Sequence, residues 1–338
     1  MYDIDLNRYT EVVDSAIALR PQIEKAVDEI CAQGYSNLFF IGCGGTYAHS
    51  LPMRYWLEST TNKVEAHAVI AAEFMVMGHK AFSKDSVCIF STRSGNTKEI
   101  VAAAKFCKEA GARTMVYVSN DNTPVCEYAD YKFYSPAEDP DLCEAIYSYI
   151  ICLLGRFMKN AGAFDKYDEF MAQYAGLTKY LIAGKEKFDP FCQEFAKKFK
   201  DVDYHMVIGG GMLWGEAYDY AMCILEEMQW IRTKSIHVCE YFHGTLELVE
   251  KDTSLILFYG EDETRPLMDR VLKFSKTVSD EITIFDTKEV ELPFTDPEFR
   301  KIVSPIVIYA ITERLSAHLA KERNHPLTTR RYYRQMEY

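Results

Sequence analysis

Two side chains in the second half of the sequence, Glu227 and His243, are of types that can move protons within one site. Glu227 follows an apolar helical pattern, a short strand pattern comes next, and His243 precedes a glycine where another helix is predicted. A carboxylate and an imidazole can share general acid and base catalysis. Each also has a simpler explanation, because Glu226 and Glu227 could form a solvated helix end and His243 a hydrogen-bonded turn. The joint order of helix, carboxylate pair, strand and His-Gly favours a catalytic site.

A glycine-rich loop at 42–46 (Gly-Cys-Gly-Gly-Thr) follows a predicted strand and begins a predicted helix. Backbone N–H groups and the positive end of a helix favour an anion at such a place. The dinucleotide fingerprint needs a glycine where Tyr47 stands, and Trp214 fills the equivalent place in the second half. A Walker A motif needs Gly-Lys-Ser/Thr, which the sequence lacks. Both nucleotide-binding hypotheses therefore fail.

A second loop, 91–97 (Ser-Thr-Arg-Ser-Gly-Asn-Thr), again lies between a predicted strand and a predicted helix. Its hydroxyl groups and its arginine would stand at a helix N-terminus, where they could hold a phosphate. The alternative is helix capping, for which serine and threonine are common residues. One hydroxyl is enough for a cap, so the group of Ser91, Thr92, Ser94 and Thr97 favours an anion site.

Strand and helix patterns alternate through the first half, which predicts a parallel sheet covered by helices on both faces. The predicted strands are 37–42, 64–70, 86–91, 114–119 and an edge strand at 131–134. The predicted helices are 47–58, 71–78 and 96–110, followed beyond Pro136 and Pro140 by long helices at about 142–160, 164–183 and 189–199.

The pattern restarts at 204–211, where a strand again ends in a glycine turn. Further strands are predicted at 236–239, 254–259 and 282–285, and helices at 213–229, 265–278 and 304–322. This weak internal repeat predicts two copies of one α/β unit. Pro326 ends the last helix, and the aromatic, basic tail Arg330–Tyr338 is expected to dock onto the protein.

Composition limits the class of protein. The chain has 338 residues, 48% hydrophobic and 26% charged, which is typical of a globular protein long enough for two domains. A net charge of −12 argues against nucleic acid binding, and the cluster Arg330, Arg331 and Arg334 is too small to change that. The ten cysteines lie mostly in apolar runs without zinc spacing. With no signal peptide pattern and no membrane span, we expect a cytoplasmic protein.

These motifs, in this order, resemble the sugar isomerase (SIS) family, which includes the isomerase half of glucosamine-6-phosphate synthase. In that family a glutamate moves a proton between adjacent sugar carbons, and a histidine helps to open the ring. The resemblance assigns those roles to Glu227 and His243. A Ser-x-Ser-Gly-x-Thr loop holds the sugar phosphate in the family. The residues that the resemblance places around the phosphate are Gly44, Gly45, Thr46, Thr92, Arg93, Ser94, Gly95 and Thr97.

Within this family the segment Glu240–Glu250 and the tail from Arg330 to Tyr338 resemble fructosamine deglycases. The resemblance adds Glu240, Arg331 and Tyr333 to the expected substrate-binding residues. Arg331 stands where the synthase has a lysine that forms a Schiff base, and an arginine stays protonated. A covalent imine through the tail is therefore not expected. An Amadori substrate already carries its nitrogen at C1 and needs no such lysine.

The resemblance implies two SIS domains, each a parallel sheet flanked by helices (flavodoxin-like), at 15–160 and 190–324. A helical connector at 161–189 and a tail at 325–338 complete the chain, and a homodimer is expected. The implied substrate is a 6-phospho-ketosamine, with no cofactor or metal. Two alternatives stay open: a phosphosugar aldose–ketose isomerase, and a regulator that binds sugar phosphate without catalysis. Glu240 could meet a cationic lysine head.

Overall fold

The computed structural model describes residues 1–137 and 143–337, which form two compact units. The first unit is Asp5–Thr178, and the second is Lys179–Tyr338 together with the N-terminal segment Met1–Ile4. The domain boundaries predicted above stay predictions. Three positions used in the sequence predictions lie outside the described residues: Pro140, Leu142 and Tyr338.

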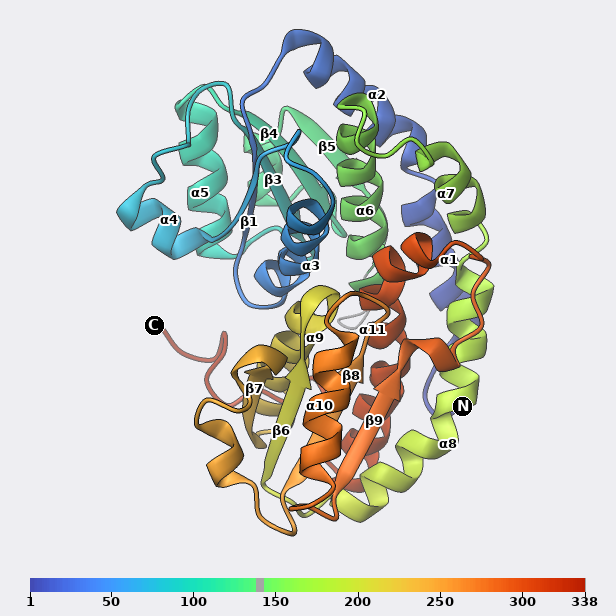
Figure 1. Ribbon diagram of the computed structural model, residues 1–338. Coiled ribbons are helices and arrows are strands. Elements are labelled where there is room, and N and C mark those ends of the chain that lie inside the picture. The colour runs from blue at the N-terminus through green and yellow to red at the C-terminus, as the bar shows by residue number, and fades with distance from the viewer. Residues whose placement is uncertain (138–142, 338) are drawn as a thin grey trace. The chain divides into compact units, whose positions relative to one another are not determined.

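The first unit contains a five-stranded sheet whose strands are all parallel, in the order β2-β1-β3-β4-β5 (Figure 1). This is the strand order of flavodoxin-like folds. The five strands lie within two residues of their predicted ranges, and β5 is an edge strand as predicted. Their bounds are β1 Leu38–Gly42, β2 Ala66–Ile70, β3 Val87–Thr92, β4 Arg113–Val118 and β5 Tyr131–Tyr134.

Helices cover both faces of this sheet, which explains the continuous apolar runs of its strands. Helices α4 (Ala71–Met77) and α5 (Lys98–Glu109) share one core with alternate residues of β1, β3 and β4. On the other face Tyr117 of β4 stacks on Tyr149 of α6 (Cys143–Asn160), with ring centroids 5.2 Å apart. The sheet is therefore a buried central layer, and only its strand ends are open to ligands.

The remaining helical segments of this unit are α1 Leu6–Ile17, α2 Arg20–Gln33, α3 Gly45–Thr60, α7 Tyr167–Tyr174 and the 3₁₀ turn η1 Pro124–Tyr128. Helices α3, α4 and α5 match predicted helices, whereas α1 and α2 are not among the predictions. The buried face of α1 carries Tyr9, Val12, Val13 and Ala16 at helical spacing. That periodic signal was present in the sequence.

Helix α8, Thr178–Phe199, corrects the prediction of two helices at 164–183 and 189–199. The break lies earlier, between α7 and α8, and Pro190 lies within α8. Gly184, in the middle of α8, is a site of close packing, because an added Cβ would come 3.1 Å from Val290 Cγ1. Tertiary packing therefore overrides the helix-breaking tendency of these residues.

The second unit repeats the same topology. Its sheet is again parallel, in the order β7-β6-β8-β9, which corresponds to β2-β1-β3-β4 of the first unit. The fold class predicted from the sequence, two α/β units with helix-flanked parallel sheets, is thus confirmed. The strand bounds are β6 Tyr204–Gly209, β7 Arg232–His237, β8 Ser254–Tyr259 and β9 Ile282–Asp286.

Three segments of the second unit differ from their predictions. Strand β7 begins at Arg232, four residues before the predicted start at 236. Helix α11, Pro297–Glu322, begins well before 304, because Asp296 caps it by accepting a hydrogen bond from Glu298 N at 2.9 Å. After His243 the chain forms only the 3₁₀ turn η5 (Thr245–Leu248) instead of an α-helix. Helix α10, Arg265–Ser275, matches its prediction.

The carboxyl ends of β6 and β8 form the point at which the strand order of the second sheet reverses, where open α/β sheets bind ligands. In this unit a side chain occupies that point. Buried Asp262 accepts hydrogen bonds from Met212 N at 2.9 Å and from Thr264 N at 2.8 Å. An added Cβ on Gly211, whose φ is +53°, would lie 2.4 Å from Asp262 Oδ1. The carboxylate thus closes the place that a bound anion would take.

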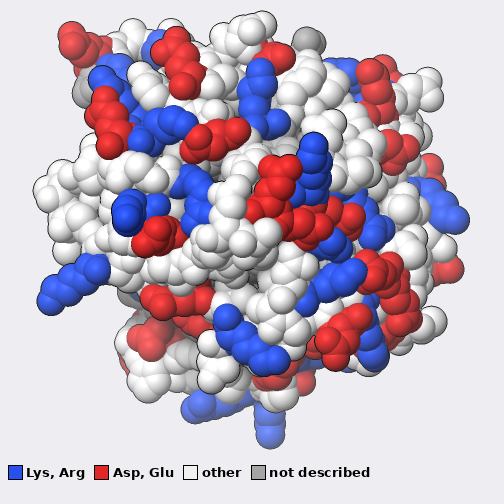
Figure 2. All heavy atoms as spheres, turned by 90° about the horizontal axis from the view of Figure 1, so that it is seen from above, with Lys and Arg blue, Asp and Glu red and all other residues white. Residues whose placement is uncertain are grey.

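Positive and negative side chains are interspersed on the face shown in Figure 2, without a continuous field of one sign. Such a surface does not present the basic stripe that a phosphate backbone requires. Within residues 1–137 and 143–337, no helix combines the length and the apolar character needed to cross a membrane.

We predict that Asp262→Ala lowers the melting temperature by several degrees, because Met212 N and Thr264 N would lose a charged acceptor. Such hydrogen bonds are worth about 1.5–3 kcal/mol each. Asp203→Ala is the matched control, because Asp203 pairs with Arg232 at 3.3 Å where both side chains are 82% exposed. Differential scanning calorimetry measures both variants. Equal melting temperatures for Asp262→Ala and wild type would contradict the view that Asp262 stabilises the loops at this end of the second sheet.

Candidate active site

The strand order of the first sheet reverses between β1 and β3, which are neighbours, and the two predicted anion-binding loops leave the sheet at this point. The first loop connects β1 to α3, and the second connects β3 to α5. Thr46 and Ser50 of the α3 end line a small pocket together with Ser91 of β3. The structure therefore brings hydroxyl groups of these two segments to one small pocket, at the point where the strand order reverses.

The first loop is tightly folded. Cys43 N donates a hydrogen bond to Thr46 Oγ1 at 3.1 Å, and Thr46 Oγ1 donates to Cys43 O at 3.0 Å. Gly44 has a φ of +55°, in the left-handed region that favours glycine. An added Cβ on Gly42 would come 2.5 Å from Tyr47 N, because the end of β1 packs closely against the first turn of α3, which begins at Gly45. The first N–H groups of an α-helix have no acceptor within the helix.

The second loop is held against the segment that follows β4. Gly95 has a φ of +62°, and an added Cβ would come 2.0 Å from Thr123 Oγ1, so only glycine fits there. Gly95 N donates to Thr92 Oγ1 at 3.1 Å, and Val125 N donates to Gly95 O at 3.1 Å. Thr97 is the residue before α5, yet its side chain makes no capping hydrogen bond. Helix capping therefore does not account for the threonine, which favours the anion-binding hypothesis.

Glu227 stands at the end of a widened helix in the second unit. Helix α9 (Trp214–Asp219) continues into the π-helix η3 (Tyr220–Glu226). Glu227 N donates to Met222 O, five residues earlier, at 3.0 Å. Single π-turns are rare in helices and occur frequently at functional sites. The extra residue in this turn changes the direction in which the side chains after it point.

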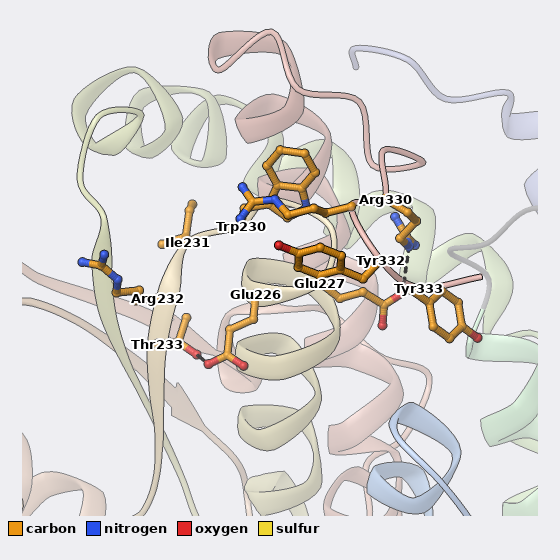
Figure 3. A pocket seen from close by; sticks show the side chains of 10 residues that line it. Glu226, Glu227, Trp230, Ile231, Arg232, Thr233, Arg330, Tyr332 and Tyr333 are labelled. Atoms are coloured by element: carbon orange, nitrogen blue, oxygen red, sulfur yellow. Dashed lines mark hydrogen bonds and ion pairs between the residues drawn. The ribbon is translucent and has the colours of Figure 1, made fainter. Parts of the chain in front are cut away.

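The two adjacent glutamates have different partners. Glu226 Oε1 accepts a hydrogen bond from Thr233 Oγ1 at 2.5 Å, which ties it to β7. Glu227 Oε1 pairs with Arg330 Nε of the tail at 2.9 Å. Figure 3 shows Glu226 directed to Thr233 and Glu227 directed to the tail. Glu227 is therefore the carboxylate that faces the tail, and Glu226 is bonded to the strand.

The environment of Glu227 makes its carboxylate more basic than usual. Burial raises the pKa of the Glu227 carboxyl above its ordinary value, and the nearby charge of Asp219 acts in the same direction. The charge and hydrogen bond of Arg330 lower this pKa and oppose the shift. The side chain is still 34% exposed, so a substrate can reach it. A partly buried base that is held by one cation is suited to take a carbon-bound proton.

A pocket of about 760 Å³ lies in front of this carboxylate. Its wall comes from the end of η3, the start of β7 and the C-terminal tail, and Figure 3 shows most of the lining side chains. Of the tail, Arg330 is half-buried at this wall, whereas Arg331–Glu337 stay exposed, so docking of the whole tail stays a prediction. The lining residues are Glu226, Glu227, Trp230, Ile231, Arg232, Thr233, Arg330, Arg331, Tyr332 and Tyr333.

The predicted site residues fall into three groups. Arg331 and Tyr333 line the pocket with Glu227, as expected of neighbours in one site. Glu240 and His243 belong to the same unit but do not line that pocket; both are exposed, at η4 (Val238–Glu240) and just after it. The loop residues Gly44, Gly45, Thr46, Thr92, Arg93, Ser94, Gly95 and Thr97 lie in the first unit.

The pocket contains residues that the predicted site lacks, among them Arg330 and Trp230. Arg330 pairs with Glu227. The sequence does not show which of the two adjacent arginines, Arg330 or Arg331, forms this ion pair. Trp230 has a left-handed backbone, with φ +56°, at a helix end where glycine is usual. No sequence signal marks a tryptophan for this conformation, because it depends on what the ring contacts.

Comparison with known proteins identifies the family. The SIS domain profile matches residues 34–154. The fructosamine deglycase of Bacillus subtilis is 30% identical over 322 residues, which are 94% of this chain and 97% of that protein. The chain belongs to the SIS domain family. The resemblance found in the sequence motifs is thereby confirmed.

Solved structures agree with this SIS assignment. A proposed phosphosugar isomerase of Bacillus subtilis has a TM-score of 0.90 and 27% identity, covering 96% of this chain and 99% of that one. The C-terminal domain of glucosamine-fructose-6-phosphate aminotransferase from Francisella tularensis has a TM-score of 0.79 at 16% identity, covering 95% of each chain, and shows the shared fold. This SIS protein is an enzyme of the fructosamine deglycase and phosphosugar isomerase type.

We predict that glucose 6-phosphate raises the melting temperature of the wild type more than that of Ser94→Ala. Loss of a hydrogen bond to a charged phosphate weakens binding by about tenfold or more. Ser59→Ala is the control, because Ser59 is exposed at the end of α3 and donates to Trp56 O at 3.2 Å. Equal ligand-induced shifts in Ser94→Ala and wild type would remove Ser94 from the phosphate site.

Proposed function

We propose that this protein is a deglycase that cleaves a 6-phosphorylated Amadori product, R–NH–CH2–CO–sugar phosphate, into an aldose 6-phosphate and a free amine. The observation that carries the proposal is Glu227, a carboxylate with raised pKa facing a pocket of about 760 Å³. Full-length similarity to a fructosamine deglycase supports it. Among the described residues that line the pocket there is no lysine to form an imine with a keto sugar.

The chemistry needs one group that carries a proton between adjacent carbons. C1 of the substrate lies between the nitrogen and the C2 carbonyl, so its protons are acidified by the ketone. The Glu227 carboxylate takes a C1 proton, and the C2 oxygen gains a proton, which gives an enaminol. The protonated Glu227 then returns a proton to C2, which gives the iminium R–NH⁺=CH–CHOH. This iminium loses its N–H proton, which balances the proton that the C2 oxygen gained, and becomes the aldimine R–N=CH–CHOH. Water adds to C1 and the amine leaves with a proton.

The other candidate residues assist this proton transfer. Arg330, paired with Glu227 Oε1 at 2.9 Å, keeps the carboxylate ionised and fixes its direction. We assign the phosphate to the loop hydroxyls of Thr46, Thr92, Ser94 and Thr97, at the helix starts of the first unit. His243 moves protons among the sugar oxygens when the ring opens. The proposed assembly is a homodimer, and the proposed compartment is the cytoplasm, where phosphorylated sugars are retained.

A product assay tests the proposal. We expect free lysine and glucose 6-phosphate from fructoselysine 6-phosphate, and much slower conversion of fructose 6-phosphate or glucosamine 6-phosphate. Chromatography of the amine and an enzymatic assay of the sugar phosphate measure both products. Interconversion of fructose and glucose 6-phosphates without amine release would identify an isomerase instead.

We predict that Glu227→Gln lowers kcat by about 10²–10⁴-fold, because general acid–base groups typically contribute this much and an amide does not accept the proton. Glu226→Gln is the matched control, since Glu226 bonds Thr233 and should keep activity within a few-fold. Circular dichroism and the glucose 6-phosphate melting shift check that both variants are folded. Near-normal turnover by Glu227→Gln would remove the proposed mechanism.

The pKa of Glu227 also predicts the pH dependence. Activity needs the ionised carboxylate, and burial raises its pKa, so the acid limb of kcat/KM should lie above the ordinary value of 4.5. Arg330→Met removes the charge that lowers this pKa and should move the limb to still higher pH. The substrate phosphate titrates identically with wild type and Arg330→Met. The difference between their two pH profiles therefore reports the carboxyl of Glu227. A limb that moves to lower pH in Arg330→Met would contradict the assignment.

A further inference from the structure

Helix α4 presents an apolar face to solvent. Its buried side, with Phe74, belongs to the core that it shares with α5. The last turn exposes Met75, Val76 and Met77, and the last two are 88% and 75% exposed. Phe106 of α5, exposed as well, has its ring centroid 5.8 Å from that of Phe74, so it continues this face. Single exposed apolar side chains are common, whereas a contiguous group of them marks an interaction surface.

The end of α4 is open to approach by another molecule. Figure 1 shows α4 at the outer edge of the first unit. Gly78 ends the helix with a φ of +66°, and an added Cβ there would meet no atom of the described residues within 4 Å. Val76 is too exposed to stabilise the unit by burial. The apolar character of this turn is therefore not explained by the folding of the first unit.

One negative and one positive side chain flank the exposed apolar residues. Glu73 precedes Val76 and Met77 by three and four positions, which places it on their face of α4. Lys80 follows the end of the helix, three positions after Met77. Both charged side chains are exposed, and in the described ranges 1–137 and 143–337 neither forms an ion pair. The order along the chain is thus a carboxylate, an apolar pair and an ammonium, evenly spaced.

We propose that this face binds a second copy of the chain, with the two α4 helices antiparallel across a twofold axis that passes between Val76 and Met77. In a twofold contact, residue i of one copy meets residue j of the other, and j meets i. Glu73 of each copy then lies opposite Lys80 of the other copy, at the rim of an apolar centre, which is the usual composition of an interface. A stable dimer buries about 800 Å² on each partner, so α4 forms the centre of a larger contact. The inference specifies the contact of the proposed homodimer and does not depend on the deglycase reaction.

A substitution at the centre of the face tests the proposal. We expect the full chain to sediment as a dimer at micromolar concentration in analytical ultracentrifugation. Val76→Glu should raise the dimer dissociation constant by about a hundredfold or more, because a carboxylate would be buried without a partner. Since Val76 is almost fully exposed within one copy, the variant should keep the circular dichroism spectrum of wild type. Leu267→Glu is the control, because it adds the same charge at an exposed apolar residue of α10, in the second unit, and should leave the dimer unchanged.

An exchange of the two charges tests the pairing. Glu73→Lys alone places two ammonium groups opposite each other at both ends of the contact, and Lys80→Glu alone places two carboxylates there. Each variant should raise the dissociation constant by about tenfold or more, because like charges then face each other. An equimolar mixture of these two variants should form a heterodimer about as tightly as wild type dimerises, because every contact in it joins an ammonium to a carboxylate. The double variant Glu73→Lys with Lys80→Glu should likewise recover the homodimer.

A monomeric wild type would overturn the inference. A dimer whose dissociation constant is unchanged in Val76→Glu would also overturn it, since another surface would then hold the two copies together. Loss of the dimer in Leu267→Glu, or no recovery in the mixture of the two charge variants, would equally contradict the twofold α4 contact. Release of amine from fructoselysine 6-phosphate by wild type is measured separately, so failure of this interface and failure of the deglycase function can be told apart.

Discussion

The ion pair between Glu227 Oε1 and Arg330 Nε, 2.9 Å long, is the contact on which the candidate active site depends. It joins the end of a π-helix to the C-terminal tail, segments that are far apart in the sequence. It also balances two opposing effects on one carboxyl, since burial raises the pKa of Glu227 and the arginine lowers it. Without the cation, a buried carboxylate tends to take up a proton and loses its ability to act as a base. The same contact places Arg331 and the tyrosines of the tail at the pocket.

The two halves of the chain share one topology but differ at the point where ligands bind. In the first unit the loops after β1 and β3 present hydroxyl groups and helix starts, and Thr97 does not cap α5. In the second unit Asp262 fills the equivalent point and accepts from Met212 N and Thr264 N. The two units therefore differ at this point, because only the second fills it with its own carboxylate. The second unit supplies the helix end that bears Glu227.

Much of the fold could be predicted from the sequence because buried parallel strands are short, continuous apolar runs, and glycine turns mark their ends. Strands β1, β3 and β8 fall within one residue of their predicted ranges for this reason. Helix α8 was predicted as two helices, but Gly184 and Pro190 both lie inside it, and an added Cβ on Gly184 would come 3.1 Å from Val290 Cγ1. The π-helix before Glu227 has no sequence signal, since a single extra residue in a turn leaves the apolar pattern almost unchanged.

The site was predictable in its residue types and less so in its contacts. Glu227, Arg331 and Tyr333 were expected together from the motif resemblance, and they line one pocket. Glu227 pairs with Arg330 and not with Arg331, and this depends on how the tail folds back. Two adjacent arginines in a sequence do not show which of them will make such a contact. The strained backbone of Trp230 likewise follows from tertiary contacts to His325 and Arg331.

The central claim is that a proton leaves C1 of the substrate and Glu227 delivers one to C2. The most direct measurement uses a 6-phosphorylated Amadori product with two deuterium atoms at C1, followed by NMR of the released sugar phosphate. The account predicts an aldose 6-phosphate with one deuterium left on C1, whether the other is found at C2 or has exchanged into water. A released ketose phosphate that retains both deuterium atoms on C1, as direct cleavage of the C1–N bond would give, would contradict it.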